Sequence, residues 1–384
     1  MRQGSSVRVL RLAAPFILAA TILLTGCSDF FQAQNTGTIS GTSSYVYVTN
    51  AGGTLTEYSL TAGVLAQLSG SPIDLPVAPT SIVVAPNNEF VLVGTATGVL
   101  LYTINSDGTL TEGNDDTVIY LNQSGLTVSS MAIDATSSWL LITYQNSTEL
   151  DALSISPTTG IPNSIAPYTA TLTFGTLAPQ ITMSPANNNV FVALGSGGTE
   201  AIGFSPTATT TTPFGTAVSI HLKTSGTSDT AVAVDPTSTY LYVAESNIAT
   251  LTAAGQLRLI KISNLTTDLA DYTTGVGPSA VLPDASGDYV YVANATDGTI
   301  SGFSFSSTSQ TLTSLGTALP TEKSPLAMVE DSSKAYVMAV GNGDNPNLWL
   351  YSFDATSLGT LDVGTTTSTA STNPSASNGI AVTH

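Results

Sequence analysis

The stretch Asp229–Glu245, DTAVAVDPTSTYLYVAE, contains the pattern that decides the fold. Its first part, Ala231–Val234, is a small apolar run. The turn that follows is Asp235-Pro236-Thr237-Ser238, in which Asp can cap its own backbone and Pro presets φ. Tyr240–Ala244 is then a β-branched and aromatic run, typical of a strand. The stretch predicts two short antiparallel strands joined by a tight turn.

The same pattern recurs along the chain. Its second half starts again at intervals of 45 to 51 residues, at Tyr45, Phe90, Trp139, Val190, Tyr240, Tyr289 and Ala335. Its first half recurs at Pro79, Ser130, Pro179, Pro278 and Pro325. The last copy of this half, Pro374–Thr383, lies at the far end of the chain. A fixed period of this length indicates a repeat architecture.

Two more strands are legible in each repeat. A third strand is expected at Leu55–Leu60, Val99–Ile104, Ile300–Phe305 and Leu348–Phe353, and a Gly-containing turn then leads to a fourth. Four antiparallel strands in 45 to 50 residues are typical of a propeller blade. We therefore predict an all-β, seven-bladed β-propeller over residues 44–384. Pairing of Gly379–Thr383 with Tyr45–Thr49 would close the ring and remove the free sheet edge.

The N-terminus has the features of an export signal. Residues 1–26 combine Arg2, Arg8 and Arg11 with an apolar stretch, Ala13–Leu24, that is too short to span a bilayer. It ends in Leu24-Thr25-Gly26-Cys27, which resembles a bacterial lipobox. The resemblance implies cleavage before Cys27 and acylation of this residue. The alternative is an ordinary cleaved signal with an incidental cysteine.

The segment after the signal is expected to be a tether. Residues 27–43 are polar and without period, so we expect a flexible linker between the lipid and the propeller. These features predict a lipid-anchored, extracytoplasmic protein of the cell envelope. Ser28 after Cys27 favours the outer membrane where the cell has one. Cys27 is the only cysteine of the 384 residues, which excludes a disulfide within the chain.

The net charge of the chain excludes some classes of binding partner. Without residues 1–26 the chain keeps five Lys and Arg against 26 Asp and Glu, a net charge of −21. A nucleic-acid role is excluded because no basic stripe could replace counterions. Anionic lipids and phosphorylated ligands would be repelled on average. We expect a monomer whose ligand is a protein or a glycan.

The repeats resemble a known family. Tyr47-Val48-Thr49-Asn50 spells YVTN, and Tyr289–Asn294 followed by Gly298–Phe305 reads YVYVAN and GTISGFSF. This pattern resembles the lactonase-type seven-bladed propellers, which include 6-phosphogluconolactonase and muconate lactonizing enzymes, over Tyr45–His384. The resemblance implies the fold and a lactonase activity, with His and Arg in the lead-ins to the inner strands. Here none of the seven lead-ins contains His or Arg, as in Ser228-Asp229-Thr230.

One set of residues could still carry hydrolysis. His221 and Lys223 fall at the end of blade 4, and Glu245 follows the second strand of blade 5. If the connection curls over the centre of the ring, His221 could act as base, Glu245 could orient it and Lys223 could stabilise an anion. Asp229 lies between them in sequence. The alternative is a surface His and Lys on an edge strand.

Other candidates have structural interpretations. Asp134, Asp235, Asp284 and Glu330 follow inner strands, where turn capping is the expected role. Gly341–Asn347 offers closely spaced oxygen donors for Ca²⁺ but lacks the regular acidic positions of a dedicated loop. His221 and His384 are the only histidines, so no metal site and no cofactor are expected. Trp139 and Trp349 are expected in the core between blades.

Three functions therefore stay open. The missing basic and imidazole groups favour a non-enzymatic binding module at the cell envelope. The alternative, implied by the resemblance, is a lactone hydrolase that acts on a sugar lactone, as 6-phosphogluconolactonase does. A purely structural envelope component is the third.

Overall fold

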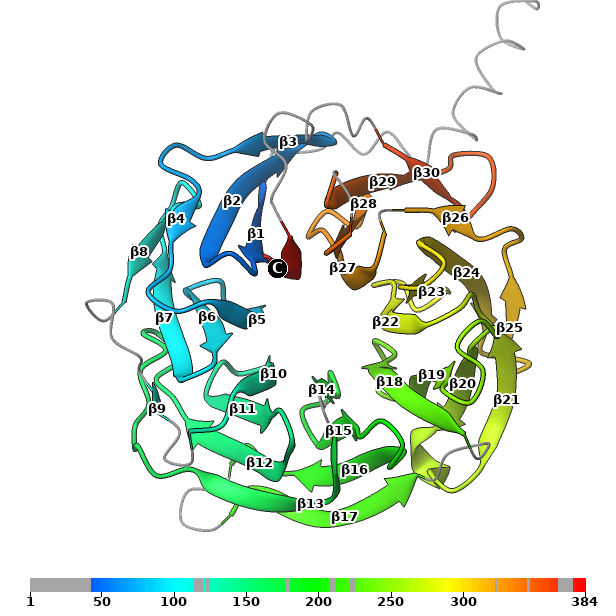
Figure 1. The fold of residues 1–384 in the computed structure, drawn as a ribbon, viewed down its shortest axis with the longest axis horizontal. Helices are drawn as coiled ribbons and strands as arrows, with labels where there is room; N and C mark the ends of the chain where they lie inside the picture. The colour runs from blue at the N-terminus through cyan, green and yellow to red at the C-terminus, as the bar shows by residue number, and fades with distance from the viewer. Residues whose placement is uncertain are drawn as a thin grey trace, which may run out of the picture. The chain divides into compact units, whose positions relative to one another are not determined.

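A computed structural model describes the fold over residues 43–113, 120–121, 125–176, 180–207, 212–220, 226–321, 323–343, 346–364 and 376–384. Seven antiparallel sheets stand around one axis like the blades of a propeller (Figure 1). Each contains four strands along its main path, and the one helical element of the described residues is a short 3₁₀ turn, η1 (Ile262–Asn264). The predicted all-β, seven-bladed architecture is confirmed. Cys27 and the tether lie outside the described residues.

The first three blades take up residues 44–176 and the C-terminal strand. Blade 1 contains β1 (Ser44–Asn50), β2 (Thr54–Thr61), β3 (Val64–Gln67), β4 (Ile73–Asp74) and β31 (Ser377–Val382). Blade 2 contains β5 (Pro79–Val84), β6 (Phe90–Thr95), β7 (Gly98–Ile104), β8 (Leu110–Glu112) and β9 (Tyr120–Leu121). Blade 3 contains β10 (Val128–Ile133), β11 (Trp139–Tyr144), β12 (Ser147–Ser154) and β13 (Tyr168–Thr176).

The other four blades follow in chain order. Blade 4 contains β14 (Gln180–Met183), β15 (Asn189–Ala193), β16 (Thr199–Phe204) and β17 (Phe214–Ile220). Blade 5 contains β18 (Thr227–Val234), β19 (Tyr240–Asn247), β20 (Gln256–Lys261) and β21 (Asp268–Thr273). Blade 6 contains β22 (Pro278–Pro283), β23 (Tyr289–Asn294), β24 (Thr299–Ser306), β25 (Thr311–Ser314) and β26 (Leu319–Pro320). Blade 7 contains β27 (Pro325–Glu330), β28 (Tyr336–Gly341), β29 (Leu348–Phe353) and β30 (Leu361–Val363).

The first and last strands of the described propeller meet in blade 1, as predicted. Strand β31 is the inner strand of this blade and pairs with β1, with Val46 opposite Val382 and Val48 opposite Ile380. The Thr383 N–H donates to the Tyr45 carbonyl at 3.0 Å, which extends the pairing by one residue. Ile380 and Val382 are buried in one apolar cluster with Met338 of blade 7. The C-terminal strand therefore closes the ring through hydrogen bonds and through packing.

Second strands form the core because both of their faces are covered by neighbouring blades. Successive side chains of a strand point to opposite faces. Val46 and Val48 pack toward Met338 of blade 7, whereas Tyr47 belongs to the cluster of Val91 in blade 2. This arrangement requires a continuous apolar run rather than alternation, which is why the YVYV-type pattern marks these strands.

Aromatic residues of the second strands form hydrogen bonds to the next blade at three junctions. The Tyr47 hydroxyl donates to the Gly108 carbonyl at 2.9 Å, and Tyr291 donates to Gly359 at 2.6 Å. Both glycines have positive φ, +82° and +77°, and lie against aromatic rings of the preceding blade. Trp139 donates from its indole N–H to the Pro206 carbonyl of blade 4 at 2.8 Å, in the core between blades where it was predicted.

Carboxylates cap the turns that join first and second strands. Asp134, Asp235, Asp284 and Asp331 each accept the N–H of the residue five positions later, at 2.5 to 2.8 Å. Turn capping is therefore the role of these residues. In blade 7 the capping residue is Asp331, so the prediction that Glu330 caps this turn was wrong by one residue. Glu330 is the last residue of β27 and accepts the Ala285 N–H of blade 6 at 2.6 Å.

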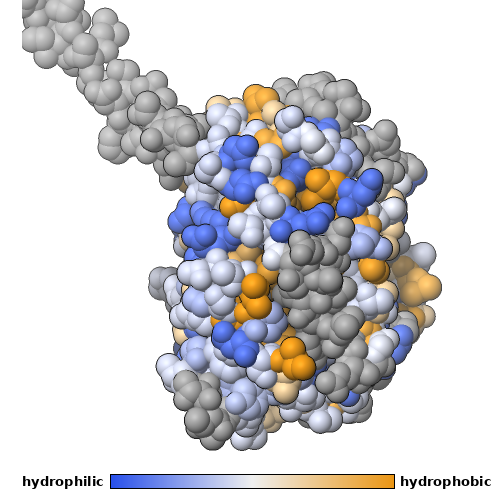
Figure 2. Space-filling model, turned by 90° about the vertical axis from the view of Figure 1, so that its left-hand side faces the viewer, coloured by the Kyte–Doolittle hydropathy of each residue, from blue (hydrophilic) through white to orange (hydrophobic). Residues whose placement is uncertain are grey.

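The surface of the propeller is mixed. Figure 2 shows hydrophobic groups separated by polar ones over the side that it displays. Exposed large apolar residues include Ile165, Leu251 and Leu358, which lie on different blades. Within the described ranges, no helix has the length and apolar character needed to cross a membrane.

Candidate functional site

The inner strands begin on one face of the ring, which we call the bulge face. Each described inner strand other than β14 carries a register shift near its first residue, where one extra residue interrupts the pairing with the second strand. Such bulges redirect side chains and often lie next to functional sites. The second strands end on the same face, so both sets of strand ends bring polar side chains together there.

Three of the extra residues connect neighbouring inner strands. Thr230 donates its hydroxyl to the Pro278 carbonyl and Ser279 donates to the Pro325 carbonyl, both at 2.6 Å. The Asn378 amide donates to the Pro79 carbonyl at 2.7 Å. These bonds satisfy carbonyl groups that the bulges remove from the ladders and hold the inner strands in register around the axis.

Two repeat positions near the bulge face carry a polar pair in several blades. One is the last residue of the second-strand motif, and the other, on the third strand, lies opposite the residue two positions before it. In blade 1 the pair is Asn50 and Thr56, at 2.9 Å. The corresponding pairs are Tyr144 and Asp151 at 2.7 Å, and Asn294 and Ser301 at 3.0 Å. In blade 5 the same positions hold Glu245 and Arg258, which form an ion pair.

The ion pair of blade 5 extends into a buried cluster, which we call the Arg258 cluster: Asp229, Glu245, Arg258 and Asp268. Nη1 of Arg258 lies 3.4 Å from Asp229 Oδ2 and 3.4 Å from Glu245 Oε2. Its Nε and Nη2 each donate to Asp268 at 3.1 Å. Asp229 is 1% exposed, Glu245 1% and Arg258 2%. Burial of this kind requires the charges to be paired.

Blade 4 covers one side of this cluster. The Thr199 hydroxyl of β16 donates to Asp229 Oδ2 at 2.7 Å. Backbone bonds between Gly195 and Asp229, both 3.0 Å, fix the start of β18 against the β15–β16 turn. Asp229 is therefore held by two blades.

The charges of the Arg258 cluster do not balance, since one guanidinium meets three carboxyl groups. Burial raises the pKa of Asp229, while the Thr199 hydrogen bond and the Arg258 charge lower it less strongly, and Glu245 raises it further through its charge and a hydrogen bond. Burial would lower the pKa of Arg258, but the Asp268 hydrogen bond and the carboxylate charges raise it on balance. The raised pKa makes Asp229 a carboxyl group that takes up a proton more readily than an exposed aspartate does.

Two of the residues singled out from the sequence, Glu245 and Asp229, come together in this cluster. His221 and Lys223 lie outside the described residues. Strand β17 ends at Ile220, one residue before His221, and Ile220 pairs with Thr199. Cys27 is also outside the described residues, as are Asp344 and Asn345 of the Gly341–Asn347 loop.

Sequence reasoning missed Arg258, Asp268 and Thr199. The family resemblance implies cationic groups in the lead-ins to inner strands. Arg258 instead lies on a third strand, β20, and its side chain reaches Asp229 from there. A signal was available, because Arg258 is one of only five Lys and Arg after residue 26. Over the described part of the chain, no group of three His, Cys, Asp or Glu side chains could hold a metal ion.

Comparison with known proteins identifies similar chains. A family model described as "Lactonase, 7-bladed beta-propeller" matches residues 180–374. No curated protein matches the sequence. Among solved structures, a candidate 6-phosphogluconolactonase from Bacteroides fragilis is 12% identical with a TM-score of 0.69, covering 89% of this chain and 98% of that one. A periplasmic gluconolactonase from Pseudomonas aeruginosa is 11% identical with a TM-score of 0.65, covering 89% of this chain and 99% of that one.

Proposed function

Because the chain belongs to the seven-bladed Lactonase propeller family, we propose that it hydrolyses the lactone ring of an uncharged sugar acid. The observation that carries the proposal is the Arg258 cluster, where two buried carboxyl groups and a cation lie beside the start of an inner strand. Buried groups with shifted pKa values are functional-site candidates. The net charge of −21 after residue 26 disfavours a phosphorylated substrate.

The proposed reaction adds water across the ester bond of the ring. His221 takes a proton from water as the oxygen attacks the lactone carbonyl, and Lys223 stabilises the resulting oxyanion. The ring C–O bond then breaks, and the alkoxide that leaves receives the proton from His221. The product is an open-chain hydroxy acid. Glu245 orients His221, and Arg258 is a positioning residue that holds Glu245 and Asp229, since it is 2% exposed and does not meet substrate.

A lactone panel tests this proposal. We expect the purified chain to hydrolyse glucono-δ-lactone above the spontaneous rate and its 6-phosphate more slowly, as followed by proton release. His221→Ala should reduce kcat/KM by about 10²- to 10⁴-fold, while Lys334→Ala, an exposed control on blade 7, should leave it unchanged. Hydrolysis of no lactone in the panel, or full activity in His221→Ala, would contradict the proposed reaction.

One observation favours a second function, a non-enzymatic binding module. Asp229 and Glu245 both pair with Arg258, and all three are nearly inaccessible, as expected of a structural cluster. Under this alternative the bulge face binds a protein or glycan without turnover. Saturable binding of a glycan that survives His221→Ala, in a protein that hydrolyses no lactone, would favour the binding module.

We also propose that Cys27 carries the lipid that anchors the protein outside the cytoplasm. The support is the Leu24–Cys27 motif after a short apolar stretch. Cells fed an alkyne fatty acid should label the wild-type chain, and Cys27→Ser should abolish both the label and the membrane fraction. Label that persists in Cys27→Ser would exclude this anchor.

A further inference from the structure

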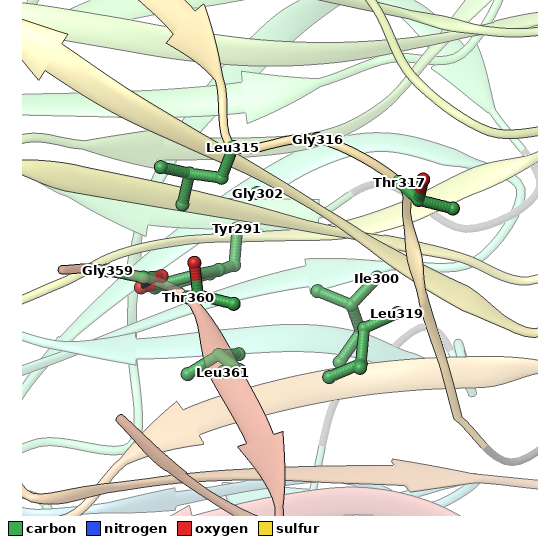
Figure 3. Close-up of a pocket in the computed structure, with 10 residues that line it drawn as sticks. All are labelled: Tyr291, Ile300, Gly302, Leu315, Gly316, Thr317, Leu319, Gly359, Thr360 and Leu361. Atoms are coloured by element: carbon green, nitrogen blue, oxygen red, sulfur yellow. Dashed lines mark hydrogen bonds between the residues drawn. The ribbon is translucent and has the colours of Figure 1, made fainter. Parts of the chain in front are cut away.

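A small cavity opens on the outer rim between blades 6 and 7, and none of its lining residues belongs to the Arg258 cluster of blade 5. It has a volume of about 50 Å³, and its apolar lining comes from Ile300, Leu315, Leu319 and Leu361. Figure 3 shows these side chains around a space that Tyr291 and Thr360 also border. The neighbouring Gly316 and Thr317 are exposed, so the cavity communicates with solvent.

The junction between blades 1 and 2 repeats the same construction. Tyr291 lies opposite Gly302, as Tyr47 lies opposite Glu57. The Leu315 N–H donates to the Gly302 carbonyl at 2.9 Å, and the Leu68 N–H donates to the Glu57 carbonyl at the same distance. The two tyrosine hydroxyls bind the equivalent carbonyls of Gly359 and Gly108. The two junctions can therefore be compared residue by residue.

In blade 1 a carboxyl group lies where blade 6 has the cavity. Glu57 is buried and its Oε1 accepts the Leu110 N–H of blade 2 at 2.7 Å. The Glu57 N–H donates to the hydroxyl of Ser71 at 2.7 Å. In blade 6, Gly302 has no side chain, and the loop from Leu315 to β26 is one residue shorter than that from Leu68 to β4.

Two backbone donors are left facing the cavity. Leu315 is outside β25, and the described bonds of this loop include none from the Gly302 N–H. Leu361 is the counterpart of Leu110 and points its N–H away from β29, because the ladder bonds use alternate residues on either side of it. Two of these bonds run from the Asp354 N–H to the Thr360 carbonyl and from the Gly364 N–H to the Leu350 carbonyl, both 2.8 Å. Gly302 is half-buried, and N–H groups that face an apolar lining need an acceptor, so this cavity favours an acceptor from outside the chain.

We propose that this cavity binds a short-chain carboxylic acid, whose carboxyl group takes the place that Glu57 fills in blade 1. The carboxyl oxygens would accept the Gly302 and Leu361 N–H groups, and a body of two or three carbons would contact the leucines. One water molecule needs about 10–15 Å³ of cavity volume. The volume of about 50 Å³ therefore suits a carboxylic acid with a body of two or three carbons and no larger molecule. Burial raises the pKa of Glu57, so the acid should bind more tightly at low pH.

Amide resonances of the two donors test the proposal directly. Propionate is titrated into the whole chain labelled with ¹⁵N-glycine and ¹⁵N-leucine, at pH 5 and pH 7.5, with 1-propanol as the control that lacks a carbonyl. We expect the Gly302 and Leu361 resonances to shift and saturate at millimolar propionate, with an affinity severalfold higher at pH 5. Propanol should leave both resonances in place.

Two matched variants locate the site. Gly302→Glu introduces the blade 1 carboxyl and should abolish the response at Leu361; its Cβ would lie 3.1 Å from the terminal Cδ1 of Leu315, which can move. Glu57→Gly opens the equivalent cavity and should create a second response at Leu110. Absence of saturable shifts in the wild type would overturn the proposal, as would a Leu361 response that survives Gly302→Glu. If Gly302→Glu does not fold, Glu57→Gly decides, and no new response at Leu110 counts against the site.

Discussion

At the scale of single residues, Arg258 determines the electrostatics of blade 5. Five oxygen atoms of three carboxyl groups surround one guanidinium that is almost inaccessible to water. A buried ion cluster contributes little net stability compared with an apolar core, but removing one partner leaves the others uncompensated. Removal of Arg258 should therefore destabilise the fold by much more than the intact cluster stabilises it.

We predict that Arg258→Met lowers the free energy of unfolding by about 3–5 kcal/mol at pH 7.5. The loss should be smaller at pH 5, where the remaining carboxyl groups can take up protons. Urea unfolding at the two pH values measures both effects. Lys334→Met, which removes an exposed cation, should change stability by no more than about 0.5 kcal/mol. Equal losses in the two variants would contradict the burial argument.

A second prediction concerns Glu330 and the dependence of stability on pH. Burial raises the pKa of Glu330 from 4.5 to about 7, and the Ala285 N–H bond lowers it less strongly. Between these values the folded chain holds a proton that the unfolded chain has released, so stability falls as pH rises from 4.5 to 7. Asp229 acts in the same direction.

Glu330→Gln should remove the contribution of Glu330 to this slope while its amide oxygen still accepts the Ala285 N–H. After allowance for solvent screening at this half-buried site, we expect the loss of stability between pH 4.5 and 7.5 to shrink by about 1–3 kcal/mol. The check is urea unfolding across this range. An unchanged slope in Glu330→Gln would mean that other groups cause the dependence.

At the scale of elements, the turns of the outer hairpins connect each blade to the one before it. Gly108 has φ +82°, and a Cβ there would overlap the Tyr45 ring; Gly70, with φ +87°, has no neighbouring atom within 4 Å. Both positions impose a backbone cost on any other residue. Only Gly108 adds a clash between blades.

We predict that Gly70→Ala lowers stability by about 1–2 kcal/mol through its backbone alone. Gly108→Ala should cost a further 1–3 kcal/mol, approximately, because the Tyr45 ring must move and the Tyr47 hydrogen bond with it. Thermal unfolding of the two single variants measures the difference. If they are equally destabilised, the tyrosine contact contributes nothing.

The number of blades, the strand pattern and the closure could be predicted from the sequence because one apolar run is repeated seven times. Burial on both faces requires apolar residues along the whole run, so the residue types alone identify these strands. The Arg258 cluster could not be predicted in the same way. Arg258 and Asp268 reach Asp229 through a pairing register, with Val243 opposite Arg258, that local pattern does not specify. The one-residue error at Glu330 has a similar cause, since adjacent Glu330 and Asp331 are both acidic.

At the scale of the whole molecule, stability depends on closure by β31. A ring of blades without the inner strand of blade 1 exposes the edge of β1 and the apolar residues that Ile380 and Val382 cover, including Met338 of blade 7. Exposed strand edges promote pairing between chains. Loss of this strand therefore affects two blades, and it also removes the covalent connection from blade 7 to blade 1.

We predict that a chain ending at Gly364 loses cooperative unfolding and associates into larger species. Light scattering after gel filtration and the slope of the urea transition are the measurements. A finer variant, Ile380→Asp, keeps the backbone pairing with Val48 but places a charge in the cluster of blades 1 and 7, and should cost at least about 3 kcal/mol. Val363→Asp, which places the same charge at an exposed apolar residue of β30 in blade 7, is the control. A monomeric, cooperatively folded chain ending at Gly364 would show that the ring does not require its last strand.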